Sequence, residues 1–323
     1  MGSPAHPLAP ADTFDPSAPS ASPGRTLLRW LAFPLLLGAP LAAAVVLMPL
    51  LGTAPALLLL ELLALFAIAA AERAMPYTDT WLRSHGDVAT DVAHVAVSGV
   101  TVAQLVRPTL DAIAVVVAGW LAALGVGGWV TLWPTSWPLV AQLALALLVA
   151  ELPQYWLHRL QHEHETLWRF HAVHHSAPRL YFLNAARFHP VDIALLYTVG
   201  YVPLIALGCP EQVLALFLLF DGVFGMLQHA NLDVRLGPLN RVFSMAEPHR
   251  WHHSRELVEA NTNYGSNLTV WDVVFGTYYL PPDVSPPTDV GIPDMPRFPS
   301  GYLGQLAAPF RWRDVKQRSA GAS

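Results

Sequence analysis

The chain contains very little cysteine and very little charge. Its 323 residues include one cysteine, Cys209, and a single lysine among 18 basic residues. One cysteine excludes a disulfide framework, a thiolate-bound zinc site and an iron–sulfur cluster. Charged residues make up 13% and hydrophobic residues 54% of the chain, whereas a typical soluble domain has about 25% charged residues. This balance favours a membrane protein.

Long apolar runs supply the candidate membrane spans. A transmembrane helix needs roughly 20 apolar residues, and several stretches approach that length. They are residues 30–51, 54–71, 110–126 and 139–157, then the pair 191–207 and 213–227, which Gly208-Cys209-Pro210 separates. Residues 87–104 are less apolar because they include Asp87, Asp91 and His94. We expect them to form a helix that lies at the membrane interface.

These runs predict an all-α fold, an integral membrane helical bundle with four to six inserted segments under a cytoplasmic helical cap. Residues 1–24 are rich in Pro, Ala and Ser, a composition typical of disorder. Residues 25–281 are expected to form the membrane-embedded domain. Residues 282–323 are expected to form a Pro-rich, loop-like tail.

The basic residues indicate an orientation for the bundle. None lies in the predicted turns at residues 52–53, 125–136 and 208–210. Positive residues stay in the cytoplasm, so the opposite helix ends are expected to be cytoplasmic. That orientation would reverse if residues 87–104 crossed the membrane. A basic cytoplasmic face suits anionic lipid headgroups or an acidic partner rather than nucleic acid.

The histidines form clusters that predict a metal site. Eight of the fourteen lie at i, i+3 or i+4 spacing, and such residues share one face of a helix. Each cluster is therefore expected to aim its imidazoles at one point. Imidazole suits iron, copper, zinc and nickel. The clusters are His158 and His162; His171, His174 and His175; and His249, His252 and His253.

The number of histidines predicts two metal ions. A catalytic zinc needs three protein ligands and a structural zinc needs four. Eight clustered histidines, or ten with His189 and His229, exceed the needs of one ion. Because imidazoles are neutral ligands, carboxylates that accept the outer ring N–H are expected to offset the metal charge. The nearby candidates are Glu151, Glu163, Asp192, Asp221, Asp233, Glu247 and Glu256.

Three segments resemble the histidine boxes of the fatty acid hydroxylase/sterol desaturase superfamily. They are YWLHRLQH at residues 155–162, FHAVHHS at 170–176 and EPHRWHHS at 247–254. RFHP at 187–190, QHAN at 228–231 and NYGSN at 263–267, followed by Trp271-Asp272 and Phe275-Gly276-Thr277, also resemble family segments. The resemblance covers residues 72–281. It implies an integral-membrane, non-haem di-iron enzyme that uses O2 and electrons to hydroxylate or desaturate a lipid taken from the bilayer.

The resemblance also implies the ligand set. The eight box histidines would bind two irons, with His229 and His189 as additional ligands, whereas His164 matches no box position and is expected to be a bystander. No dinucleotide or haem-attachment motif is present. Electrons are therefore expected from a separate donor, which could be a ferredoxin, a cytochrome b5-like protein or reductase, or a reduced pterin.

Three alternatives to lipid hydroxylation stay open. Glu163 directly follows the first box, which is similar to alkylglycerol monooxygenase, a pterin-dependent branch that cleaves ether lipids. This likeness predicts a catalytic role for Glu163. A zinc-dependent membrane hydrolase is the second alternative, although the H-E-x-x-H pattern of zinc proteases is absent. A metal transporter is the third, and the nearly charge-free spans disfavour it.

Overall fold

The computed structural model describes residues 23–123 and 132–321, and within them the protein is helical, with no β-strand beyond three isolated bridges. Eight longer or connecting helices come first: α1 (Pro23–Leu51), α2 (Thr53–Ala74), α3 (Val88–Ala93), α4 (Val100–Ala123), α5 (Leu139–Glu163), α6 (Glu165–His175), α7 (Pro190–Ala206) and α8 (Glu211–His229). Five short helices follow: α9 (Ala246–His252), α10 (Leu257–Ala260), α11 (Val270–Phe275), α12 (Tyr302–Ala307) and α13 (Trp312–Ala320). The predicted all-α class is confirmed.

Four helices of the described chain are long and apolar enough to cross a membrane, namely α1, α2, α5 and α8. They match four of the predicted spans, so the protein is a multi-pass membrane protein. The predicted span 191–207 corresponds to the shorter apolar helix α7. The predicted span 110–126 falls in α4 as far as residue 123, and its remainder lies outside the described residues.

The helix predicted at residues 87–104 forms the first part of a longer helix, and its position at the membrane interface stays a prediction. Helix α3 continues through the π-helix η2 (His94–Gly99) into α4 without a break. Asp91 and His94, which suggested an interfacial position, are instead buried inside the protein. Residues 88–123 therefore form one continuous helix.

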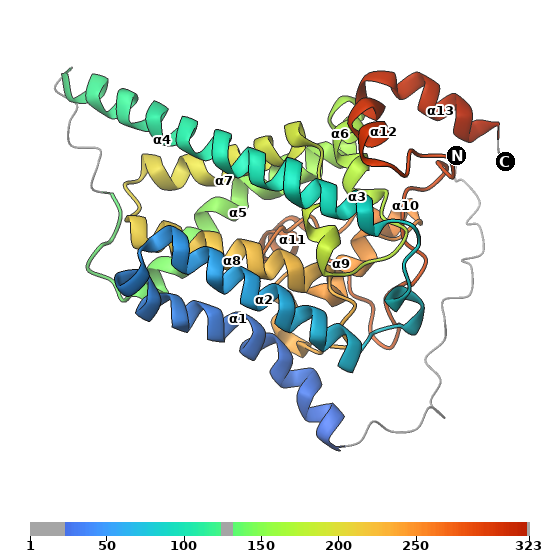
Figure 1. Ribbon diagram of the computed structural model, residues 1–323, viewed down its shortest axis with the longest axis horizontal. Coiled ribbons are helices and arrows are strands. Elements are labelled where there is room, and N and C mark those ends of the chain that lie inside the picture. The colour runs from blue at the N-terminus through green and yellow to red at the C-terminus, as the bar shows by residue number, and fades with distance from the viewer. Residues whose placement is uncertain (1–22, 124–131, 322–323) are drawn as a thin grey trace.

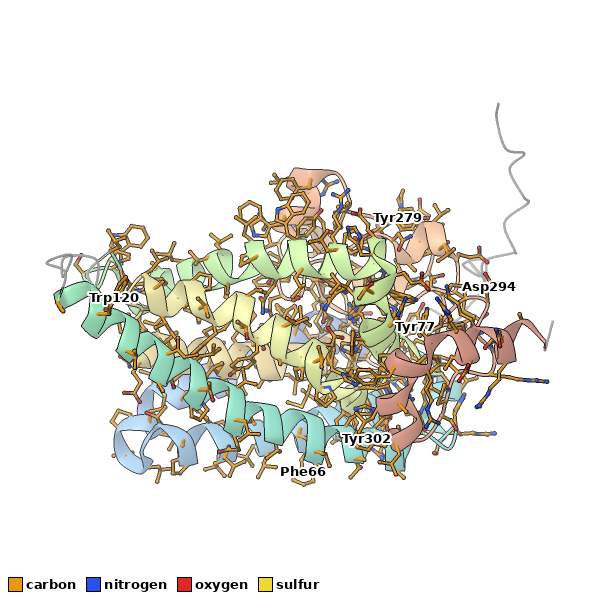
Figure 2. All side chains as sticks on the ribbon, turned by 90° about the horizontal axis from the view of Figure 1, so that it is seen from above. Phe66, Tyr77, Trp120, Tyr279, Asp294 and Tyr302 are labelled. Carbon is orange, nitrogen blue, oxygen red and sulfur yellow. The ribbon has the colours of Figure 1, made fainter. Side chains whose placement is uncertain are left out.

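The helices run between two ends of the molecule. The α1–α2 turn at Gly52 and the α7–α8 turn at Gly208 lie at one end, and α6, α9 and α13 gather at the other (Figure 1). Gly52 and Gly208 have φ values of 85° and 74°, which glycine adopts without steric cost. Figure 2 shows the exposed side chains of Phe66 and Trp120 at the outer edge of the bundle, where a lipid-facing surface is expected.

Helix α8 lies at the centre of the bundle and packs against α1, α2 and α5. Its buried side chains include Leu219, Phe224 and Leu227, whereas α1 and α2 present leucines such as Leu35 and Leu58 to the outside. Because α8 is held from several sides, its last residue, His229, has a fixed position at the histidine-bearing end.

Residues 281–301 lack helices, in keeping with the loop that the proline content of the tail predicted, but the rest of the tail is helical. It forms α12, the 3-10 helix η6 (Ala308–Arg311) and α13. Trp312 is buried, and its indole N–H donates a 2.9 Å hydrogen bond to the Glu165 carboxylate at the start of α6. Tertiary packing on α6 therefore stabilises helices that the local sequence did not reveal.

Candidate metal centre

Four helix ends bring nine histidines together at one end of the bundle. The end of α5 supplies two of them, α6 supplies three, α8 supplies one and the α9 segment supplies three. Eight of the nine side chains are buried, and His162 is half-buried. They are His158, His162, His171, His174, His175, His229, His249, His252 and His253.

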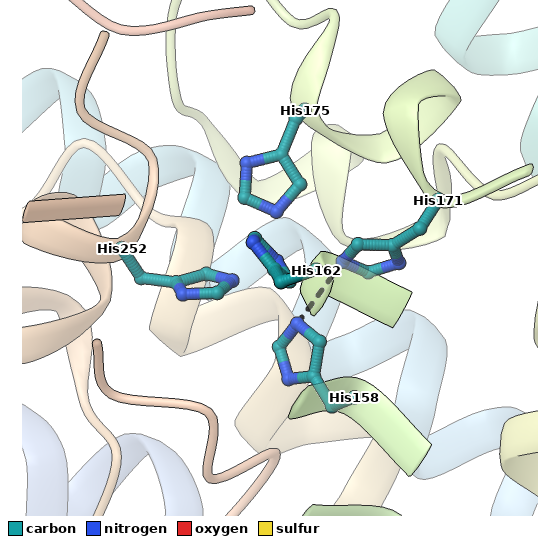
Figure 3. Close-up of side chains that lie close together, drawn as sticks. All are labelled: His158, His162, His171, His175 and His252. Carbon is teal, nitrogen blue, oxygen red and sulfur yellow. Dashed lines mark hydrogen bonds between the residues drawn. The ribbon is translucent and has the colours of Figure 1, made fainter. Parts of the chain in front are cut away.

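These nine residues form two groups, each of which offers ligand atoms that lie within 4.8 Å of one another. The five-histidine group consists of His158, His162, His171, His175 and His252, and Figure 3 shows their rings facing a common centre. The four-histidine group consists of His174, His229, His249 and His253. The groups adjoin, since the ring centroids of His175 and His253 are 4.4 Å apart.

The expectation that each sequence cluster aims at one point is wrong for two of the three clusters. The second cluster sends His171 and His175 to one group and His174 to the other. At 3.6 residues per turn, an i,i+4 pair differs in direction by about 40° but an i,i+3 pair by about 60° to the opposite side. Pairs at i,i+4 therefore share a group, whereas the i+3 member joins the neighbouring group.

Backbone carbonyls fix the tautomer of several rings. His158 donates from Nδ1 to the Tyr264 carbonyl at 2.7 Å, and His252 donates to the Thr262 carbonyl at 2.7 Å. In the other group, His229 donates to the Gly225 carbonyl at 2.9 Å. A carbonyl can only accept a hydrogen bond, so Nδ1 carries the proton in each ring. The lone pair of Nε2 then faces the centre of the group.

The inner nitrogen atoms fit a metal better than they fit one another. The Nε2 atoms of His158 and His171 are 3.0 Å apart, as are those of His229 and His249. In addition, the buried Nε2 atoms of His162, His175 and His252 have no hydrogen-bond partner among the described residues. A buried polar atom without a partner is costly. Metal coordination would satisfy all of these lone pairs at once.

Burial keeps these imidazoles in the neutral form that binds a metal. Outside the spans, desolvation lowers the pKa of His174, His175 and His249 well below the ordinary value, and the neighbouring imidazoles lower it further. The same two causes lower the pKa of His252 and His253. At neutral pH the rings are therefore available as ligands, as metal binding requires.

Comparison with known proteins gives the site its context. The sequence profile of the fatty acid hydroxylase family matches residues 143–277, which include all nine histidines. The chain is also 41% identical to the ornithine lipid hydroxylase OlsE of Rhizobium tropici, over 77% of this chain and 74% of that protein.

The chain belongs to the fatty acid hydroxylase family.

More distant relatives of this hydroxylase match shorter regions. The alkylglycerol monooxygenase of Danio rerio is 34% identical over 45% of this chain and 31% of its own length. Methylsterol monooxygenase 1 of Rattus norvegicus is 32% identical over 38% of this chain and 41% of its own length. No solved structure matches. The predicted family and enzyme class are thus confirmed, with a histidine-rich candidate metal site in a multi-pass membrane enzyme.

Two predicted site residues of the hydroxylase lie outside both groups. His189 caps α7, where its Nδ1 accepts a 3.1 Å hydrogen bond from the Val191 N–H. Its Nε2 lies 3.3 Å from the Leu306 carbonyl. Glu163 is at the surface, with 47% of its side chain exposed, and pairs with Arg159 at 2.8 Å. The structure brings neither residue to the inner nitrogen atoms.

Among the candidate carboxylates, Asp192 contacts a grouped histidine. Its Oδ2 accepts from His171 Nδ1 at 3.0 Å, while Gln161 donates to Oδ1. Five others make their hydrogen bonds elsewhere: Glu151 and Asp221 to the segment 266–267, Glu163 to Arg159, Asp233 to Arg29, and Glu247 to Arg235 and Asn240. Glu256 belongs to neither histidine group. Asp192 therefore provides direct anionic support for the five-histidine group.

Sequence reasoning missed the polar atoms that orient the other rings. The acceptors at Thr262 and Tyr264 are backbone carbonyls, which every residue has. The sequence therefore could not predict that these two would bind histidine rings. Asn261 accepts from His162 Nδ1 through its side-chain oxygen at 3.2 Å. Its place two residues before a family segment was the one available clue.

Proposed function

We propose that this hydroxylase inserts oxygen from O2 into a C–H bond of a membrane lipid, using two irons held by the five-histidine and four-histidine groups. The observation that carries the proposal is the set of nine imidazoles whose inner nitrogen atoms converge in two adjoining groups. The five-histidine group alone exceeds the three or four ligands of a zinc site. It argues against the zinc hydrolase that the sequence left open.

The chain's own residues would prepare the site for this reaction. Bound iron would supply the O2 chemistry. The Tyr264 and Thr262 carbonyls orient two rings of the five-histidine group, and Asp192 adds negative charge beside His171. Phe188 stacks on His174 with a centroid separation of 4.1 Å and an interplanar angle of 12°. This apolar contact excludes water from one side of the four-histidine group.

The site's position supports a lipid substrate. Three of the nine histidines, His158, His162 and His229, lie at the ends of α5 and α8, which are candidate spans. A chain lying in the bilayer could therefore reach the site without leaving its apolar surroundings. The Rhizobium relative is an ornithine lipid hydroxylase, which points to the same class of substrate. Oxygen insertion next to an ether oxygen is the second candidate, because an alkylglycerol monooxygenase shares 34% identity.

The metal content of the purified protein tests this proposal. Protein purified in detergent from iron-replete cells should hold about two irons per chain, since each group offers enough ligands for one ion. Lipid profiling of cells with and without the gene should show a hydroxylated lipid that depends on O2 and iron. One zinc per chain and no iron would refute the proposal, and a released aldehyde in place of a hydroxylated lipid would favour ether cleavage.

We also propose that the two histidine groups face the cytoplasm, where a separate electron donor would reach them. All basic residues of the loops and turns lie at the helix ends that carry the site, and such residues stay cytoplasmic. A reporter fused after Gly52 should report the non-cytoplasmic side, and one fused after Arg179 the cytoplasmic side. An external signal after Arg179 would overturn this orientation, and the Gly52 fusion controls for reporter function.

A further inference from the structure

The segment at residues 263–268 is held by two buried carboxylates. Asp272 accepts from the backbone N–H of Tyr264 at 2.7 Å and of Gly265 at 2.9 Å. Glu151 accepts from the next two backbone N–H groups, at Ser266 and Asn267. Both carboxylates are fully buried. Four consecutive peptide N–H groups therefore donate to side-chain carboxyl oxygens, which fixes the path of this segment.

One peptide of this segment also contacts a grouped histidine. The carbonyl of Tyr264 accepts from His158 Nδ1 at 2.7 Å, and the N–H of the same peptide, on Gly265, donates to Asp272 Oδ2 at 2.9 Å. Hydrogen bonds in a chain polarise one another. The carboxylate of Asp272 thus makes the Tyr264 carbonyl a stronger acceptor for the His158 ring proton.

The close approach depends on the absence of a side chain at Gly265. A Cβ there would lie 2.2 Å from the Leu268 carbonyl oxygen and 2.9 Å from Asp272 Oδ2. Neither distance is tolerable, so only glycine lets the peptide sit between the carboxylate and the ring. The need for glycine at residue 265 therefore comes from the contact between this peptide and Asp272, and the spacing of the histidines does not predict it.

We propose that Asp272 is a positioning residue for the metal, acting on His158 through the Tyr264–Gly265 peptide. This inference rests on the proposed di-iron function. Asp192 contacts His171 directly, so the five-histidine group receives negative charge from one direct carboxylate and one relayed through a peptide. Carboxylates that polarise a ligand histidine strengthen metal binding and stabilise the more positive oxidation state.

Asp272 is suited to the role because it is ionised yet enclosed. Burial raises its pKa to about 6, while the Thr277 hydroxyl and the two backbone N–H groups oppose that rise. The carboxylate is therefore the major form at neutral pH. The Thr277 hydroxyl donates to Asp272 Oδ1 at 2.7 Å and lies 2.9 Å from the Tyr155 hydroxyl. The hydroxyls of Thr277 and Tyr155 thus hold the Asp272 carboxylate in place beside the segment at residues 263–268.

The test compares Asp272→Asn with Glu151→Gln in protein loaded with the iron isotope 57Fe. Both changes remove a buried carboxylate that holds the same segment, but only Asp272 contacts the peptide that bears the His158 acceptor. Asp272→Asn should alter one of the two Mössbauer iron signals, raise the reduction potential of that iron and weaken its retention against a chelator about tenfold. Glu151→Gln should leave these properties as in the parent protein.

Equal effects of the two variants, or no effect of Asp272→Asn with two irons bound, would overturn the relay. A parent protein that binds no iron would instead refute the proposed function, so the two failures are distinguishable. If Asp272→Asn does not fold, Thr277→Val serves in its place. It leaves the carboxylate but removes a donor that lowers its pKa. At alkaline pH, where Asp272 stays ionised, the more basic carboxylate should lower the reduction potential. An unchanged or raised potential in Thr277→Val would then overturn the proposal.

Discussion

Replacing His174 with alanine should lower the iron content from about two to about one per chain and abolish hydroxylation. The four-histidine group would lose one of its four imidazole ligands and so bind its iron too weakly to retain it. The same change removes the ring that stacks on Phe188. The loss should be specific to one metal position, since the five-histidine group keeps all of its members. Iron analysis and product formation are measured on the same preparation.

The matched control is His164→Ala, which removes a histidine of the same region. His164 lies between α5 and α6, is exposed, and belongs to neither group. Its replacement should leave iron content and turnover near those of the parent. Glu163→Ala separates a further possibility: if its carboxylate takes part in the reaction, iron stays bound while turnover falls. Iron loss in His164→Ala as complete as in His174→Ala would contradict the assignment of the groups.

Local spacing predicted the members of the site well, because an i,i+4 pair on a helix faces one way whatever surrounds it. His158 with His162 and His171 with His175 each remain together in the structure. Spacing could not predict how the pairs divide between two groups, since that depends on how α5, α6, α8 and the α9 segment meet. His189 illustrates the limit: its sequence context suits a ligand, yet its ring caps α7.

The spans were predictable for a similar reason. An apolar run long enough to cross a bilayer usually forms a membrane-spanning helix. The helices α1, α2, α5 and α8 therefore lie where the sequence predicted spans. The burial of Asp91 was not predictable, because a charged residue in a moderately apolar segment is usually exposed. Its hydrogen-bond partners are 90 or more positions away in the chain, as its bond to Tyr181 shows. A local sequence pattern cannot predict such distant partners.

Those distant partners make Asp91 the residue whose loss should destabilise the fold most. Its carboxylate accepts from the Arg187 guanidinium at 2.6 Å, the Tyr181 hydroxyl at 2.7 Å and the Asn184 amide at 3.0 Å. All four side chains are buried. Asp91→Ala would leave the Arg187 charge buried without its partner, which costs about 3–5 kcal/mol of unfolding free energy. Thermal unfolding in detergent, followed by loss of helical signal, measures the effect.

A surface ion pair provides the comparison for this prediction. Arg255 and Asp289 form a 2.9 Å pair in which 82% of the Asp289 side chain is exposed, so Asp289→Asn should change stability by less than about 1 kcal/mol. The effect of Asp91→Ala should also reach the metal site, because Arg187 immediately precedes Phe188, whose ring stacks on His174. Iron should therefore be lost at a lower temperature than in Asp289→Asn. Equal unfolding temperatures for the two variants would show that the buried network does not hold the site in place.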